Sequence, residues 1–166
     1  FSVGQFQFLQ DRPLAQKPSG SVLALAPFFE GKMPGEFQLP VGDVAALTRD
    51  DFFKPLPNSG AEAQAIARLT NGEAIIGANA TKANFLKRSP DFKILHLATH
   101  SAANDVLGEY SFVALQAENA GQKIDMLYAR DIYGLRLSAD LVVLSACETA
   151  LGQYRNGEGI IGLTRA

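Results

Sequence analysis

The sequence is short of cysteine, of basic clusters and of long apolar runs, and each shortage excludes a class of protein. A single cysteine, Cys147, makes an internal disulfide impossible, which fits a reducing compartment, and we expect the cytoplasm. Fifteen Lys and Arg stand against seventeen Asp and Glu without any basic block, so a nucleic-acid partner is not expected. No apolar run approaches the roughly 18 residues of a membrane-spanning helix, and the first residues do not resemble a secretion signal. A membrane partner is therefore not expected either.

The apolar content is sufficient for one domain. A chain of 166 residues with 47% hydrophobic residues can form one sizeable core, whereas two separate cores would be crowded. The sequence begins at Phe1 without a methionine and stops at Ala166 while helical spacing is still developing. We expect one domain, a piece of a longer protein, with an edge strand, a first core strand and a long loop in residues 1–58 and the main core in residues 59–166.

Short apolar runs alternate with helical segments along the chain, and this order is typical of βαβ units. Such units predict an α/β fold with a mainly parallel sheet and right-handed crossovers. A small hairpin, at Tyr110 to Leu115 and Gln122 to Ile124, is expected beside this sheet. The spacing of Ser59 and Glu62 predicts a capping box at the start of the first helix. The expected strands are Phe1 to Leu9, Val22 to Ala26, Glu73 to Gly77, Phe92 to Ala98 and Leu141 to Leu144, and the expected helices are Ser59 to Thr70, Thr81 to Arg88 and Met126 to Tyr133.

Two of these strands lead to reactive side chains. The apolar run Leu141 to Leu144 is typical of a parallel strand covered on both faces, and Cys147 follows it; His100 follows the strand at Phe92 to Ala98. Adjacent strands lie roughly 5 Å apart, and reacting groups of open α/β sheets gather at the carboxyl ends of strands. An imidazole beside a thiol raises the thiolate fraction and can protonate a leaving amine. The pattern predicts a cysteine nucleophile paired with a histidine.

Five segments stand in order along the second half of the chain: ILHLATHS (94–101), YSFVAL (110–115), LYARDIYGLRL (127–137), ADLVVLSACETALG (139–152) and GEGIIGLTRA (157–166). Together they resemble the CHAT domain, a family of caspase-like cysteine peptidases that is often fused to tetratricopeptide (TPR) repeats. The resemblance covers Leu56 to Ala166, with weaker similarity before it. His100 precedes Cys147 by 47 positions, and a histidine about 50 residues before the cysteine is a known pattern of caspases.

The resemblance implies a caspase-hemoglobinase-like three-layer sandwich whose catalytic core lies in residues 59–166, equivalent to the large-subunit half. It assigns His100 as general base and acid and Cys147 as nucleophile of a peptidase. It also assigns the backbone amides of Cys147 and Ser101 to the oxyanion hole, although many caspase-like peptidases have glycine at the position of Ser101. It implies a protein or peptide substrate and TPR repeats in the same or a partner chain, and no cofactor.

Substrate preference and even activity are left open by the sequence. Caspase relatives outside animals commonly favour a basic residue through an acidic pocket, and the acidic residues near the expected strand ends are Asp105, Glu109, Asp140 and Glu148. The alternative to a peptidase is a catalytically silent CHAT-like module that binds a partner protein and signals through repeats outside this chain.

Other motifs have structural interpretations. We expect His96, in the middle of a strand, to be a buried and hydrogen-bonded histidine. His96, His100 and Cys147 could be read as zinc ligands, but no further ligand has suitable spacing, so no metal is expected. The G-x-G-x-x-G pattern at residues 157–162 does not follow a strand directly, as a dinucleotide site requires. Ser145 lacks the flanking glycines of an esterase nucleophile.

Overall fold

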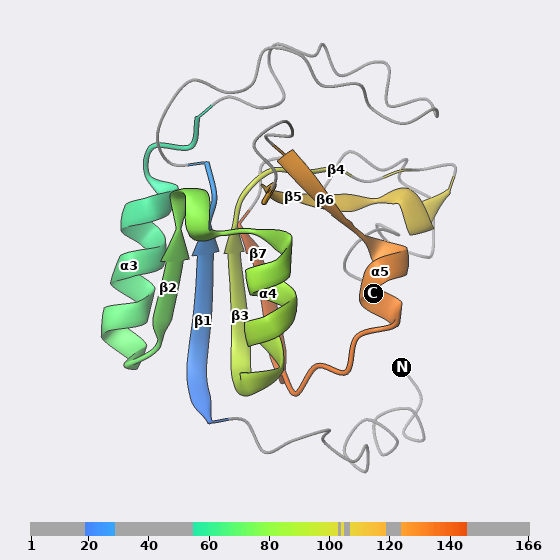
Figure 1. Cartoon of the computed structure of the whole chain (residues 1–166). Helices are drawn as coiled ribbons and strands as arrows, with labels where there is room; N and C mark the ends of the chain where they lie inside the picture. The colour runs from blue at the N-terminus through green and yellow to red at the C-terminus, as the bar shows by residue number, and fades with distance from the viewer. Residues whose placement is uncertain (1–18, 29–54, 103, 105–106, 119–123, 146–166) are drawn as a thin grey trace, which may run out of the picture.

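The computed structural model describes residues 19–28, 55–102, 104, 107–118 and 124–145 of the chain. Its centre is a four-stranded parallel sheet in the order β2-β1-β3-β7 (Figure 1). The strand expected at residues 1–9 and most of the long loop expected before residue 58 lie outside the described residues. The strands of this main sheet are β1 (Gly20–Ala26), β2 (Glu73–Ile76), β3 (Phe92–Ala98) and β7 (Leu141–Ser145).

A smaller antiparallel sheet, in the order β4-β5-β6, crosses above the carboxyl ends of the main strands (Figure 1). The expected hairpin is confirmed, but it gains a third strand and its last strand is longer than expected. The helix predicted at Met126 to Tyr133 is wrong in its first half, because that half belongs to β6. Met126 and Leu127 are buried on opposite faces of β6, in different core clusters, so the sequence shows no period-2 alternation there. The strands are β4 (Ser101–Ala102), β5 (Phe112–Gln116) and β6 (Ile124–Tyr128).

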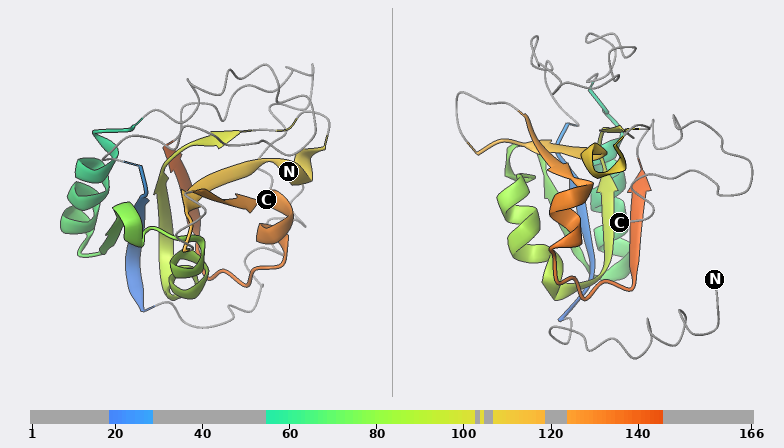
Figure 2. Two further views of the ribbon diagram at one scale, coloured as in Figure 1. Left: turned by 45° about the horizontal axis from the view of Figure 1, so that its top comes forward. Right: turned by 90° about the vertical axis from the view of Figure 1, so that its right-hand side faces the viewer.

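The helices cover both faces of the main sheet. Alanines of β1 and β3 pack against Ala63 of α3 (Ser59–Thr70) on one face. Leucines of the same strands pack on the other face with Phe85 of α4 (Lys82–Arg88) and with the smaller sheet. The three layers are visible in Figure 2. The α/β class, the mainly parallel sheet and the helices on both faces are thus confirmed. The remaining elements are α5 (Ala129–Tyr133) and short 3-10 turns at Gly77–Asn79, Ser89–Asp91 and Gly108–Tyr110.

The start of helix α3 differs from the prediction, whereas its end agrees with it. The predicted capping box is wrong: the Ser59 hydroxyl donates to the carbonyl of Leu56 at 2.7 Å, and the Glu62 carboxylate bonds to His96 instead. The end is as expected, because Asn71 adopts the left-handed conformation with φ of 51° and stops the helix. Gly72 follows against β1, where an added Cβ would lie 2.4 Å from the backbone oxygen of Val22.

The predicted burial of β7 on both faces is wrong. Leu141 is 51% exposed and Val142 is 47% exposed. Within the described residues β7 is the edge strand of the main sheet and pairs with β3 alone, while α3 contacts β1, β2 and β3. An apolar run therefore indicates a strand but does not indicate which of its faces another element covers.

Candidate active site

The carboxyl ends of β3 and β7 lie side by side in the main sheet. The two strands are parallel and adjacent, and Ala98 pairs with Ser145 at their ends. His100 comes two residues after Ala98, and Cys147 comes two residues after Ser145 in the sequence. Cys147 itself lies outside the described residues, so the predicted pair of His100 and Cys147 stays a prediction. The register of β3 and β7 brings the strand ends that precede these two positions to one edge of the sheet.

The backbone around His100 is held by the smaller sheet. The amide of Ala114 donates to the carbonyl of His100 at 2.9 Å, and the buried Thr99 hydroxyl donates to the carbonyl of Ala114 at 2.7 Å. His100 is 7% exposed, and its imidazole lies against the ring of Phe28, with 5.7 Å between the ring centroids. A single residue of β5 thus fixes the chain on both sides of the Thr99–His100 peptide, and this limits the orientations that the imidazole can adopt.

Ser101 begins β4 and pairs with Val113 of β5. The hydrogen bond from the Ala114 amide to the His100 carbonyl flanks this pair, so Ser101 and Val113 form a non-hydrogen-bonded pair of the antiparallel ladder. The Ser101 amide therefore points away from β5, an orientation suited to the predicted oxyanion donor, although that role stays a prediction. Its hydroxyl is buried and has no hydrogen-bond partner within the described part of the chain.

His96 is a buried, hydrogen-bonded histidine, as expected. It is 6% exposed, and its Nε2 lies 2.9 Å from Oε1 of Glu62 on α3. An ionised carboxylate only accepts hydrogen bonds, so the N–H at Nε2 of His96 donates the hydrogen bond and Oε1 of Glu62 accepts it. The interaction joins the strand that leads to His100 to the first turn of α3.

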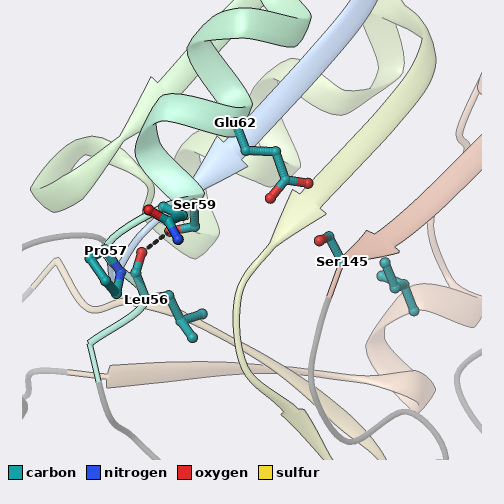
Figure 3. Close-up of a pocket in the computed structure, with 7 residues that line it drawn as sticks. Leu56, Pro57, Ser59, Glu62 and Ser145 are labelled. Atoms are coloured by element: carbon teal, nitrogen blue, oxygen red, sulfur yellow. Dashed lines mark hydrogen bonds between the residues drawn. The ribbon is translucent and has the colours of Figure 1, made fainter.

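A pocket of about 440 Å³ lies where α3 begins and β7 ends (Figure 3). Glu62 is the charged residue among its described lining residues, and it extends from α3 toward the end of β7, where Ser145 lies (Figure 3). The pocket is therefore at the carboxyl edge of the sheet, on the face that α3 covers. Its described lining residues are Leu56, Pro57, Asn58, Ser59, Glu62, Leu144 and Ser145.

Two of the four acidic residues predicted for a substrate pocket, Glu109 and Asp140, are described, and neither lines this pocket. Asp140 is at the wrong end of the sheet: it precedes β7, and its amide bonds to the carbonyl of Lys93 near the start of β3 at 2.7 Å. It is placed there because β7 runs parallel to β3, so a residue before the strand lies at the amino edge. Glu109 is exposed in a 3-10 turn before β5. Asp105 and Glu148 lie outside the described residues.

The sequence predictions missed Glu62 and the residues before it as parts of a pocket. A signal for them did exist. The helix that follows a strand of a parallel sheet starts near the carboxyl edge of that sheet, where ligand sites of α/β proteins form. The spacing of Glu62 from Ser59 favours a capping box, and this local pattern carries no information on the position of the helix in the fold.

Among the described helices, none is long and apolar enough to cross a membrane, and no group of three His, Cys, Asp or Glu side chains in the described ranges could hold a metal ion.

Comparisons with curated proteins and with solved structures give no match. The family model of the CHAT domain matches residues 4–166, nearly the whole chain. The chain therefore belongs to the CHAT domain family, which is related to the caspase-like peptidases.

Proposed function

We propose that this chain carries the catalytic residues of a cysteine endopeptidase, with Cys147 as nucleophile and His100 as general base and acid. The observation that carries the proposal is the register of β3 and β7, in which each of the two residues follows a paired strand end by two positions. The backbone bonds around His100 support it, because a general base must be held within reach of the proton that it removes.

The proposed reaction has two stages. In the first, His100 takes the thiol proton as the Cys147 sulfur attacks the scissile carbonyl carbon; the C–N bond then breaks, a thioester forms, and His100 delivers the proton to the leaving amine. In the second, His100 removes a proton from water and the resulting hydroxide attacks the thioester carbon; the C–S bond then breaks, the acid product leaves, and His100 returns its proton to the Cys147 sulfur. The amides of Ser101 and Cys147 would donate to the carbonyl oxygen in both tetrahedral intermediates.

An electrophilic peptide probe tests this function. Because the chain has one cysteine, labelling of the chain is expected at Cys147 alone, and it is expected to fall to background in Cys147→Ala and in His100→Ala. His96→Gln is the matched control, since glutamine keeps a donor for Glu62 and removes the other histidine, and it should label at nearly the wild-type rate. Mass spectrometry of the labelled peptide checks the site.

Equal background labelling of the wild type and both variants would contradict the proposal and favour the silent binding module. Circular dichroism of each variant shows whether a loss of labelling reflects a loss of fold.

A further inference from the structure

Helix α5 packs against the 3-10 turn before β5, on the side of the molecule opposite α3 (Figure 1). Leu107 and Tyr133 are exposed hydrophobic side chains of these two segments, and the side chain of Arg130 is 47% exposed. Tyrosine and arginine are enriched at the centres of protein–protein interfaces. We propose that this surface binds a partner protein through a glutamate or aspartate side chain that pairs with Arg130. The residues of this Arg130 surface are Leu107, Tyr110, Tyr128, Arg130 and Tyr133.

Arg130 is held by two aromatic rings and not by a carboxylate. Its Cζ lies 4.8 Å from the centroid of the Tyr110 ring and 4.9 Å from the centroid of the Tyr128 ring. Attraction to an aromatic face needs no oxygen acceptor, so it leaves N–H donors of the guanidinium available. Oδ1 of Asp131 lies 3.9 Å from Nε of Arg130, which is too far for a hydrogen bond, and Oδ2 of the same carboxylate bonds to Lys82 at 2.9 Å. The guanidinium is therefore free to bind an external carboxylate.

The two tyrosine rings that hold Arg130 are themselves fixed. Their centroids lie 6.3 Å apart with an angle of 75° between the rings, and the Tyr128 ring also packs edge-on against the buried Phe112. The Ala129 amide at the start of α5 donates to the Ser111 carbonyl, directly after the 3-10 turn, at 2.8 Å. A guanidinium held in this way loses little side-chain freedom when a ligand binds, which lowers the entropic cost of binding.

The surroundings of Arg130 favour a single carboxylate over a polyanion. A planar guanidinium can bind a carboxylate through two parallel N–H···O bonds. Glu109 is exposed in the same 3-10 turn and the chain has a net charge of -2, so a nucleic-acid backbone would meet acidic groups beside the arginine. Tyr133 follows Arg130 by three positions on α5, on the same side of the helix, and offers contact area to an apolar neighbour of the acid. The structure thus favours a protein segment in which a carboxylate lies between apolar side chains.

NMR titration of the full chain carrying Cys147→Ala tests this inference without any catalysis. The probes are two short capped peptides with leucine on both sides of a central residue, which is glutamate in one and glutamine in the other. The glutamate peptide should bind about 3- to 10-fold more tightly, as expected for a charge-assisted pair at a half-exposed site. Arg130→Gln should remove this difference, because it removes the charge. Arg136→Gln, which neutralises an exposed arginine after α5, is the matched control and should retain the difference.

A second measurement covers the case in which Arg130→Gln does not fold. With Arg130 intact, the NMR signal of its Nε–H group should shift as the glutamate peptide is added and hardly shift with the glutamine peptide, while the corresponding signal of Arg136 stays constant. Equal affinities for the two peptides, a glutamate preference that survives Arg130→Gln, an equal loss in Arg136→Gln, or no binding of either peptide would overturn the inference. The Arg130 surface includes neither His100 nor Cys147, so a failure of the proposed peptidase function appears separately, as the absence of Cys147 labelling in the wild type.

Discussion

Thr99 helps to hold the backbone that carries His100. Its hydroxyl is buried and bonds to the carbonyl of Ala114, the same residue whose amide holds the His100 carbonyl. These two bonds join the end of β3 to the middle of β5. Thr99 is therefore a positioning residue, because it acts on the histidine through the backbone and not through contact with a substrate.

Thr99→Val should weaken both the fold and the reactivity of Cys147. Valine keeps the shape but leaves the buried Ala114 carbonyl without its donor, so we expect a loss of about 1–3 kcal/mol in the free energy of unfolding. Urea unfolding measures this loss, and the rate of probe labelling measures the effect on His100. Thr99→Ser retains the hydroxyl and should restore most of the labelling rate. If Thr99→Val labels as fast as the wild type, Thr99 contributes to stability alone.

At the scale of elements, Lys82 connects α4 to the smaller sheet. Its ammonium group bonds to the carbonyl of Met126 at 2.8 Å and to Oδ2 of Asp131 at 2.9 Å. Burial of Asp131 opposes its ionisation, but the hydrogen bonds from Lys82 and the Tyr128 amide, with the nearby positive charges of Lys82 and Arg130, outweigh it and lower the pKa of Asp131. These bonds of Lys82 thus join α4, which packs on the main sheet, to β6 of the smaller sheet and to α5.

Asp131→Asn should reduce stability at neutral pH and have little effect in acid. A carboxyl whose pKa is lowered on folding stabilises the protein above its unfolded pKa, near 3.8, and that contribution disappears as the pH falls through the lowered folded pKa. We expect a difference of about 1 kcal/mol from the wild type at pH 7, which shrinks below about pH 4. Urea unfolding at several pH values measures it.

Asp125→Asn is the matched control for this change. Asp125 lies 3.9 Å from the same lysine and its side chain is 47% exposed, so its removal should cost less than the removal of Asp131. Equal losses for the two variants, or a loss for Asp131→Asn that persists in acid, would contradict the proposed ion pair.

At the scale of the whole molecule, the exposed strand β7 bears on how the chain associates with other chains. Leu141 and Val142 leave apolar surface open along an edge strand of the described sheet, and unpaired strand edges are templates for association with other chains. Leu69 of α3 is more exposed, at 87%, but it lies on a helix whose backbone is already hydrogen-bonded. Association of this chain should therefore depend on β7.

Val142→Lys should reduce self-association of the chain. A lysine on an edge strand must keep its charge in water, so a second strand pairs less readily there. Analytical ultracentrifugation over a range of protein concentrations should show a larger monomer fraction for Val142→Lys than for the wild type. Leu69→Lys adds the same charge on a helix and should leave the distribution nearly unchanged. Equal effects of the two variants would indicate that net charge, and not the strand edge, controls association.

The sequence by itself determined the elements whose signals are local. The run at Phe92 to Ala98 has the same limits as β3, and Asn71 ends its helix as expected, because apolar runs and left-handed caps depend on neighbouring residues. The alternation of strands and helices was sufficient to predict the parallel sheet, and hence that the ends before His100 and Cys147 share one edge. The burial of His96 followed from its place within an apolar strand.

Tertiary structure decided what depends on contacts between distant segments. Met126 and Leu127 extend β6 because each finds a different core cluster, so their pattern did not distinguish a strand from a helix. Glu62 bonds to His96 and faces a pocket because α3 packs on β3, although its spacing from Ser59 favoured a cap. Asp140 lies far from the pocket because of strand direction. A sequence pattern records local preference, whereas the partner of a carboxylate or the covering of a strand depends on which surfaces the folded chain brings together.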